Sequence, residues 1–262
     1  WGAHVTNRLL GVKNDKAGGS YIALRTALIE AVKEVHPEHA DVAESFDQIA
    51  SFMKQFQTVH CLNYDLTVYW AMMHWNHKDV ANKDRFMDGL LNQGFPKAPN
   101  DWPSRKGGRR VTRVLYPHGR LILASDLFGN YRKISAGRDK LLLVNIGDAW
   151  EQKELIPMFV SEEKSPQKRK NIERSHYLRT VFNDYLPLCK NVVIFGWSLE
   201  EKDQHLITKM LMGRVARIAI SVYPNGKSAS AIEAECEAMA GMIVNSLPAN
   251  KEAPIIDFFD ST

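Results

Sequence analysis

Residues 57–70 read QTVHCLNYDLTVYW, and this stretch decides the fold class. Its apolar residues suit a protein interior, whereas Asn63 and Asp65 compete with the backbone for hydrogen bonds and favour a turn. The pattern predicts a short buried strand VHCL, a polar turn, and a helix that continues through Trp70 and Met73. Two explanations of the turn stay open. Its polar side chains either cap the next helix or lie where ligands bind, outside the ends of parallel strands.

Outward from this stretch, short apolar strands alternate with amphipathic helices along the chain. This alternation predicts an α/β fold in which a doubly wound, mostly parallel sheet is covered by helices on both faces. We expect Ser20 to cap the first helix and Pro37 to limit it. The expected helices span residues 20–35, 41–56, 166–185, 202–212 and 229–247. The expected later strands span residues 157–160, 191–196 and 216–223.

Between the second of these helices and the later strands, residues 78–110 lose the regular pattern and become rich in Asn, Asp, Gly, Pro and Lys. We interpret this segment as a long insertion in a single domain that spans residues 1–262. The following segments RVLYP (113–117) and RLILA (120–124) flank the pair HG. They are predicted to form two strands around a tight turn.

The composition is that of an ordinary globular protein, with 45% apolar and 24% charged residues in 262. No apolar run approaches the roughly 20 residues of a membrane span, and no signal-peptide pattern opens the chain. We therefore expect a soluble, cytoplasmic protein. The net charge of +4 is too mild to indicate a nucleic-acid partner by itself. The chain begins with Trp1 rather than Met, so we expect a segment upstream.

Two basic clusters could contact phosphates, although solvated surface is the favoured interpretation because neither cluster is interleaved with aromatic residues. The first cluster comprises Arg105, Lys106, Arg109, Arg110 and Arg113, and the second comprises Lys164, Lys168, Arg169 and Lys170. His74 and His77 share a helical face without a carboxylate pattern, so we predict no metal site there. The three cysteines, Cys61, Cys189 and Cys236, lie far apart and are expected to be buried thiols.

Polar groups recur where the predicted strands end. If the strands are parallel, these groups gather along one edge of the sheet, where a nucleotide would lie. They are Asn63–Asp65, His118–Gly119, Ser161–Glu162, Gly196–Leu199, and Ser221 with Tyr223.

The order of these segments is specific. Their order resembles that of motifs in the sirtuin-like clan: NYD, then HG, then FVSE, then GWSL followed by an acidic residue. Within that clan it resembles a family of bacterial proteins with TNYD-, LHG-, P-x-x-VSE- and GxSL-x-x-D-type motifs. The likeness runs from Tyr21 to Tyr223 and implies a doubly wound, Rossmann-like fold that binds NAD.

The resemblance also implies roles for individual residues. It places Asn63 near the nicotinamide ribose with Asp65 as its companion acid, and it makes His118 the general base. The residues that it assigns to binding the dinucleotide are Gly119, Ser161, Glu162, Gly196, Trp197, Ser198 and Ser221. Trp197 replaces a smaller polar residue of the clan, and Ser221 falls near the adenosine ribose.

These residue types suit cleavage of the bond between nicotinamide and ribose. The reaction develops oxocarbenium-like charge and needs oriented dipoles and a base. Asn63 can hold a hydroxyl or a water through its donor and its acceptor, and His118 titrates near neutrality and can take the proton. Gly119 permits a turn and a close approach to a ligand.

Two departures from the clan narrow the expected activity. The clan's first strand and glycine loop, which bind pyrophosphate, are missing, because KAGGS at 16–20 has glycines but no apolar strand before it. We expect that motif upstream of Trp1. The four-cysteine zinc module of deacylating sirtuins is also missing, which favours NAD hydrolysis over protein deacylation.

Three functions therefore stay open. The first is an NAD glycohydrolase that uses no metal ion. By analogy with relatives in the clan, it would be an effector of a bacterial antiviral system. It would then act as a homo-oligomer or with a partner protein of that system. The second is a non-catalytic nucleotide-binding or sensing module of the same fold. The third is a nucleic-acid-associated protein that uses the basic loop at 104–113.

Overall fold

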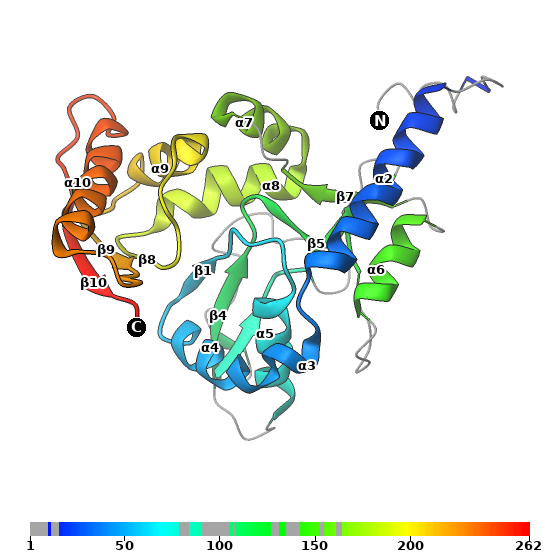
Figure 1. The fold of residues 1–262 in the computed structure, drawn as a ribbon, viewed down its shortest axis with the longest axis horizontal. Coiled ribbons are helices and arrows are strands. Elements are labelled where there is room, and N and C mark those ends of the chain that lie inside the picture. Colours follow the sequence, from blue (N-terminus) through cyan, green and yellow to red (C-terminus); the bar gives the residue numbers. More distant parts are fainter. Residues whose placement is uncertain are drawn as a thin grey trace. The chain divides into compact units, whose positions relative to one another are not determined.

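The computed structural model divides the chain into two compact units (Figure 1). The first unit comprises Trp1–Phe95 and Pro103–Phe159, and the second comprises Pro96–Trp102 and Val160–Thr262. A single domain over residues 1–262 stays a prediction. The residues that the structure describes are 10–11, 16–78, 84–90, 105–106, 108–126, 131–134, 142–151, 155–160 and 164–262.

The predicted helices of the first unit form with shifted ends, whereas the helix at Leu142–Glu151 was not predicted. The first predicted helix begins at Lys16, so KAGGS is helical and Ser20 lies inside the helix instead of capping it. The second predicted helix is broken into three short pieces, of which the last packs Phe46, Ala50 and Met53 into the core. The helical segments are α2 (Lys16–Val35), α3 (His39–Val42), η1 (Ala43–Ser45), α4 (Phe46–Met53), α5 (Thr67–Lys78) and α6 (Leu142–Glu151).

A mostly parallel sheet in the first unit contains the predicted strand at the opening stretch. The predicted strand VHCL forms at Thr58–His60, ending two residues early, and the turn and the helix α5 follow it. The order is β1-β4-β2 with parallel pairing, and β3 adds to β4 antiparallel. The strands are β1 (Thr58–His60), β2 (Asp84–Met87), β3 (Arg105–Lys106) and β4 (Arg109–Leu115).

The expected insertion therefore contributes β2 and β3 to this sheet. The Asn76 side chain on α5 donates to the Phe86 carbonyl at 2.9 Å and accepts from the Phe86 N–H at 3.0 Å. These two bonds fix β2 beside α5. Residues 79–83, 91–104 and 107 of the expected insertion lie outside the described residues.

The predicted hairpin between RVLYP and RLILA is wrong, because the second strand belongs to another sheet of the first unit. It is antiparallel, in the order β6-β5-β7, with β5 (Gly119–Ser125), β6 (Tyr131–Lys133) and β7 (Ile156–Phe159). RVLYP and RLILA do form strands, but β4 and β5 belong to different sheets. Tight hairpins need a positive φ at their first central residue, and Pro117 fixes a negative φ there. The turn consequently carries the chain from one sheet to the other.

The second unit is built on a parallel sheet in the order β10-β9-β8 (Figure 1). Its strands are β8 (Asn191–Ile194), β9 (Arg217–Val222) and β10 (Ile255–Asp260), of which the predicted pattern contained the first two. The predicted helix over 166–185 is interrupted at Ser175, whose hydroxyl caps the next segment. The helical segments are α7 (Ser165–Arg174), α8 (His176–Thr180), η3 (Val181–Tyr185), η4 (Leu186–Leu188), η5 (Glu201–Asp203), α9 (Gln204–Leu211) and α10 (Ala229–Asn245).

These elements confirm a mixed α/β fold with parallel sheets. One doubly wound sheet stays a prediction, because the described strands form three separately bonded sheets. Within the described residues, no helix combines the length and the hydrophobicity that a membrane span requires.

Candidate functional site

The first candidate site lies where β1 and β4 end. Because β1 and β4 are parallel neighbours, the loops that follow them leave the sheet at the same edge. The pairing continues one residue beyond β1, where the Cys61 N–H donates to the Leu115 carbonyl at 2.8 Å. Asn63 follows β1 and is exposed. Asp65 Oδ1 accepts a hydrogen bond from the Thr67 N–H at 2.7 Å, an Asx turn at the start of α5 that agrees with the helix-capping explanation.

The second turn of this site, Tyr116–Gly119, follows β4. The Gly119 N–H donates to the Tyr116 carbonyl at 3.0 Å, and Gly119 has a φ of +78°, a conformation that favours glycine. His118 therefore lies on a turn, as predicted. It is nevertheless buried, with 3% of its surface exposed.

Arg120 joins the two turns, and the sequence patterns gave no hint of this role. It is fully buried, with 0% exposure. Its Nε donates to the Asp65 carbonyl at 2.7 Å and its Nη2 donates to the same oxygen. Its Nη1 lies 4.0 Å from Cys61 Sγ, and its guanidinium stands 4.7 Å from the Tyr116 ring centroid. The structure thereby brings the Asn63–Asp65 turn and the His118–Gly119 turn together through one arginine.

Burial keeps the neutral partners of Arg120 uncharged. It raises the pKa of the Cys61 thiol and that of the Tyr116 hydroxyl, and attraction to the guanidinium opposes both shifts only in part. The positive charge of Arg120 is thus held by a carbonyl oxygen, a thiol and an aromatic face. Among the described residues no carboxylate forms a salt bridge with Arg120, and the Asp65 carboxylate attracts it only over a longer range.

His60, the last residue of β1, is a buried histidine whose protonation makes the stability of the fold depend on pH. Both of its ring nitrogens are buried without a hydrogen-bond partner in the described part of the chain. Burial lowers the pKa of His60 to about 4, from an ordinary value near 6.5. The folded protein therefore keeps His60 neutral in a range where the unfolded chain binds a proton.

We expect acid to weaken the fold through His60. As the pH falls from about 7 to about 5, the unfolded state gains the proton and the free energy of unfolding drops by about 2 kcal/mol from this residue. Urea unfolding at both pH values measures the loss. A His60→Leu variant should lose less stability than the wild type over this range, and an equal loss in both proteins would refute the assignment.

The second candidate site is the loop that follows β8 in the second unit. Gly196 and Leu199 both have positive φ, at 64° and 55°, which is unusual for a leucine. The Leu199 side chain is buried. The Gly196 N–H donates to Ser221 Oγ at 3.0 Å and so joins the ends of β8 and β9. Strained backbone of this kind persists only where surrounding contacts fix it, and it occurs often at ligand sites.

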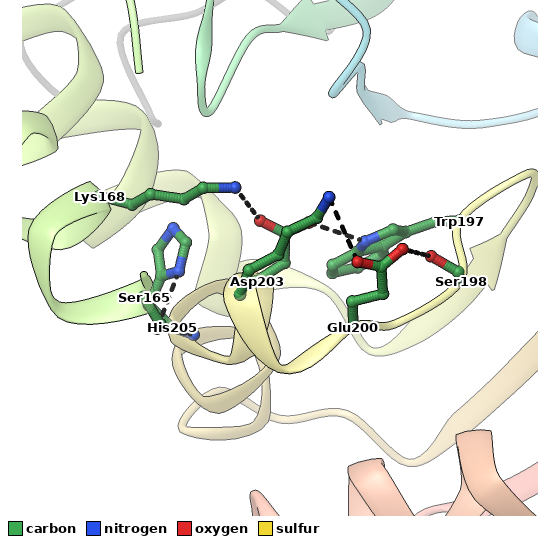
Figure 2. Close-up of polar contacts among 8 residues, drawn as sticks. Ser165, Lys168, Trp197, Ser198, Glu200, Asp203 and His205 are labelled. Atoms are coloured by element: carbon green, nitrogen blue, oxygen red, sulfur yellow. Dashed lines mark hydrogen bonds and ion pairs between the residues drawn. The ribbon is translucent and has the colours of Figure 1, made fainter. Parts of the chain in front are cut away.

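Buried side chains anchor the same loop (Figure 2). The Trp197 indole N–H donates to Asp203 Oδ2 at 3.3 Å, and Lys168 Nζ lies 2.8 Å from Asp203 Oδ1. Ser198 Oγ donates to Glu200 Oε1 at 3.0 Å, and this bond lowers the pKa of that exposed carboxyl. Lys168 was expected on solvated surface with its neighbours, and this is wrong for Lys168 because only 1% of it is exposed.

A further contact joins α7 to α9 in this unit (Figure 2). Ser165 Oγ accepts from the His205 N–H at 3.0 Å and lies 3.1 Å from His205 Nδ1. Neither residue was predicted as a site residue.

The whole chain, residues 1–262, matches a family model described as Domain of unknown function (DUF4917). The chain belongs to the DUF4917 family. A search of the curated proteins finds none that matches it.

The structure describes some of the other residues singled out from the sequence. Ser161 and Glu162 lie outside the described residues. His74 Nε2 lies 3.3 Å from Asp47 Oδ1 and His77 Nδ1 lies 2.6 Å from the Met73 carbonyl. The two histidines thus have separate protein partners. Cys61 is a buried thiol as predicted, whereas Cys189 and Cys236 are free and half-buried.

We expect the protein not to bind nucleic acid through its basic loop. Of that cluster, Arg110 donates to the Lys54 carbonyl and lies 3.5 Å from Asp84 Oδ2, so its charge is already engaged by protein. Filter binding of a DNA or RNA oligonucleotide at rising salt tests this. Binding that weakens steeply with salt, and that is lost when Arg105, Lys106, Arg109 and Arg110 become Ala, would contradict the expectation.

Proposed function

We propose that this protein is an NAD glycohydrolase that cleaves the bond between nicotinamide and ribose. The observation that carries the proposal is the convergence of the Asn63–Asp65 and His118–Gly119 turns at one edge of a parallel sheet. Ligands of α/β sheets bind outside the carboxyl ends of parallel strands. The resemblance to the sirtuin-like clan, with its Rossmann-like fold, supplies NAD as the ligand.

In the proposed reaction, water attacks the anomeric carbon of the ribose as the carbon–nitrogen bond to nicotinamide breaks. The electron pair of that bond leaves with nicotinamide, which becomes neutral, and the proton of the attacking water passes to His118. Asn63 is exposed and can hold a ribose hydroxyl or the water through its amide. The products are nicotinamide and ADP-ribose.

The second unit supports the proposal by itself. Gly196 and Ser221 meet at the ends of two neighbouring parallel strands, where the resemblance expects contacts to the dinucleotide. Trp197 and Ser198 belong to the same loop. A role as a bacterial defence effector, alone or with a partner protein, is part of the proposal by analogy with the clan.

One observation favours the alternative of a non-catalytic nucleotide-binding module. A general base must reach the proton that it takes, and His118 has only 3% of its surface exposed. A sensing module would use the same loops without this requirement.

Calorimetric titration with NAD and with ADP-ribose, combined with chromatography of the NAD solution, tests the proposal. A glycohydrolase releases nicotinamide over time and binds its product ADP-ribose. A sensing module binds NAD and leaves it intact. A folded protein that neither binds nor cleaves NAD would refute both functions.

A further inference from the structure

The buried ion pair Lys168–Asp203 is the feature of the second unit that the proposed function leaves unexplained. The ammonium comes from α7, the carboxylate from the last residue of η5, and only 1% and 8% of these residues is exposed. Removing both charges from water is costly, and apolar residues in place of a buried pair often stabilise a protein equally well. Stability alone therefore gives no reason for charges at these positions.

The geometry gives a reason in what Asp203 does with its second oxygen. Oδ1 lies 2.8 Å from Lys168 Nζ, while Oδ2 accepts from the Trp197 indole N–H at 3.3 Å. Figure 2 shows Asp203 between Lys168 on one side and Trp197 on the other. Lys168 holds the carboxylate, and the carboxylate holds the edge of the indole. A hydrogen bond to a charged acceptor is directional and about twice as strong as a neutral one.

The indole belongs to the strained loop after β8. Trp197 is only half-buried, and in the described part of the chain no aromatic ring or cation packs on its faces. The positive φ values of Gly196 and Leu199 bracket it. The loop thus has one anchor at its start, the bond from Gly196 to Ser221, and one at its side, the bond from Trp197 to Asp203.

We propose that Lys168 and Asp203 are positioning residues, which fix Trp197 and thereby pre-form the loop Gly196–Leu199 for a nucleotide. This inference rests on the proposed function in so far as the ligand is NAD. Its structural part, the fixed indole, is measurable without any ligand. Neither residue contacts the ligand in this account, so both act through Trp197.

The test removes both charges together. In the double variant Lys168→Met with Asp203→Leu both members of this pair are removed, so neither charge is left buried without the other, and the fold should survive. We expect its affinity for NAD to fall about tenfold or more, as when a group that orients a binding residue is lost. The matched control is the exposed pair Arg217–Asp257 of the same unit, 2.9 Å apart, changed to Gln and Asn. This control should bind NAD as the wild type does.

A second readout separates this inference from the proposed function. The Trp197 indole N–H resonance, assigned by its disappearance in Trp197→Phe, should shift and exchange faster with solvent in the double variant. If the wild type binds no NAD, the proposed function fails, and the indole resonance still decides whether Lys168 and Asp203 fix Trp197. An unchanged resonance together with wild-type affinity would overturn the inference.

Trp197→Phe is a second variant that tests the inference even if the double variant does not fold. It keeps the ion pair and an aromatic ring but loses the donor to Asp203. We expect Trp197→Phe to stay folded and to bind NAD more weakly than the wild type does. Wild-type affinity in this variant would contradict the positioning role.

Discussion

Replacing His118 or Asn63 by Ala is expected to slow nicotinamide release from NAD by on the order of a hundredfold or more. His118→Ala removes the group that takes the proton of the attacking water. Asn63→Ala removes the amide that holds the water or a ribose hydroxyl. The rate of nicotinamide formation at saturating NAD, followed by chromatography, measures both effects.

The two variants need different controls, because His118 is buried and Asn63 is exposed. Ala at position 118 leaves a cavity, so His118→Gln, which fills the space without acting as a base, should show the same loss of rate at a near-normal unfolding midpoint. His77→Ala, an exposed histidine on α5, is the matched control and should keep the full rate. Wild-type release from folded His118→Gln would remove His118 from the mechanism.

Arg120→Met is expected to lower both the stability and the activity of the protein. The Asp65 carbonyl loses both of its donors from Arg120, and an acceptor left unsatisfied in the interior costs about 1–3 kcal/mol. The turns of Asn63 and His118 also lose their common tie. A displacement of about 1 Å in a catalytic group can lower the rate on the order of a hundredfold. Urea unfolding and the nicotinamide assay measure the two effects.

Arg120→Lys separates charge from shape. Lysine keeps the positive charge but cannot present two donors to one carbonyl in the fixed geometry of a guanidinium, so it should restore only part of the rate. Arg132→Met, at an exposed arginine on β6 of the same unit, is the matched control. Arg120→Met with the stability and rate of the wild type would contradict the role of this residue.

The local pattern of the sequence was sufficient for some elements. The strand, turn and helix around Asn63 and Asp65 were predicted because each depends on neighbouring residues. The bond from the Thr67 N–H to Asp65 is local in the same way. The strands β8 and β9 are short apolar runs and were predicted for the same reason. In contrast, β2 (Asp84–Met87) reads DRFM and lies in a segment of turn-forming residues, so its parallel partner decides it.

The burial of the cations in the two candidate sites could not be predicted from local sequence patterns. Arg120 meets the Asp65 carbonyl from 55 residues away, and Lys168 meets Asp203 from 35 residues away. Nothing in the neighbouring sequence distinguishes these cations from solvated ones, and Lys168 in particular stands among exposed basic residues. The predicted pairing of β4 with β5 failed for a different reason. Pro117 fixes a negative φ in the turn between them, so β4 pairs with β1 and β2, and β5 pairs with β6 and β7. The predicted binding of the dinucleotide by Ser161 and Glu162 stays a prediction.

Proton NMR of NAD incubated with the purified protein tests the central claim most directly, because it identifies which bond is cut. We predict that the nicotinamide resonances of NAD are replaced by those of free nicotinamide, and that ADP-ribose forms in an equal amount. NAD that stays intact beside the folded protein would contradict the account. So would products that retain the bond between nicotinamide and ribose, such as nicotinamide mononucleotide with AMP.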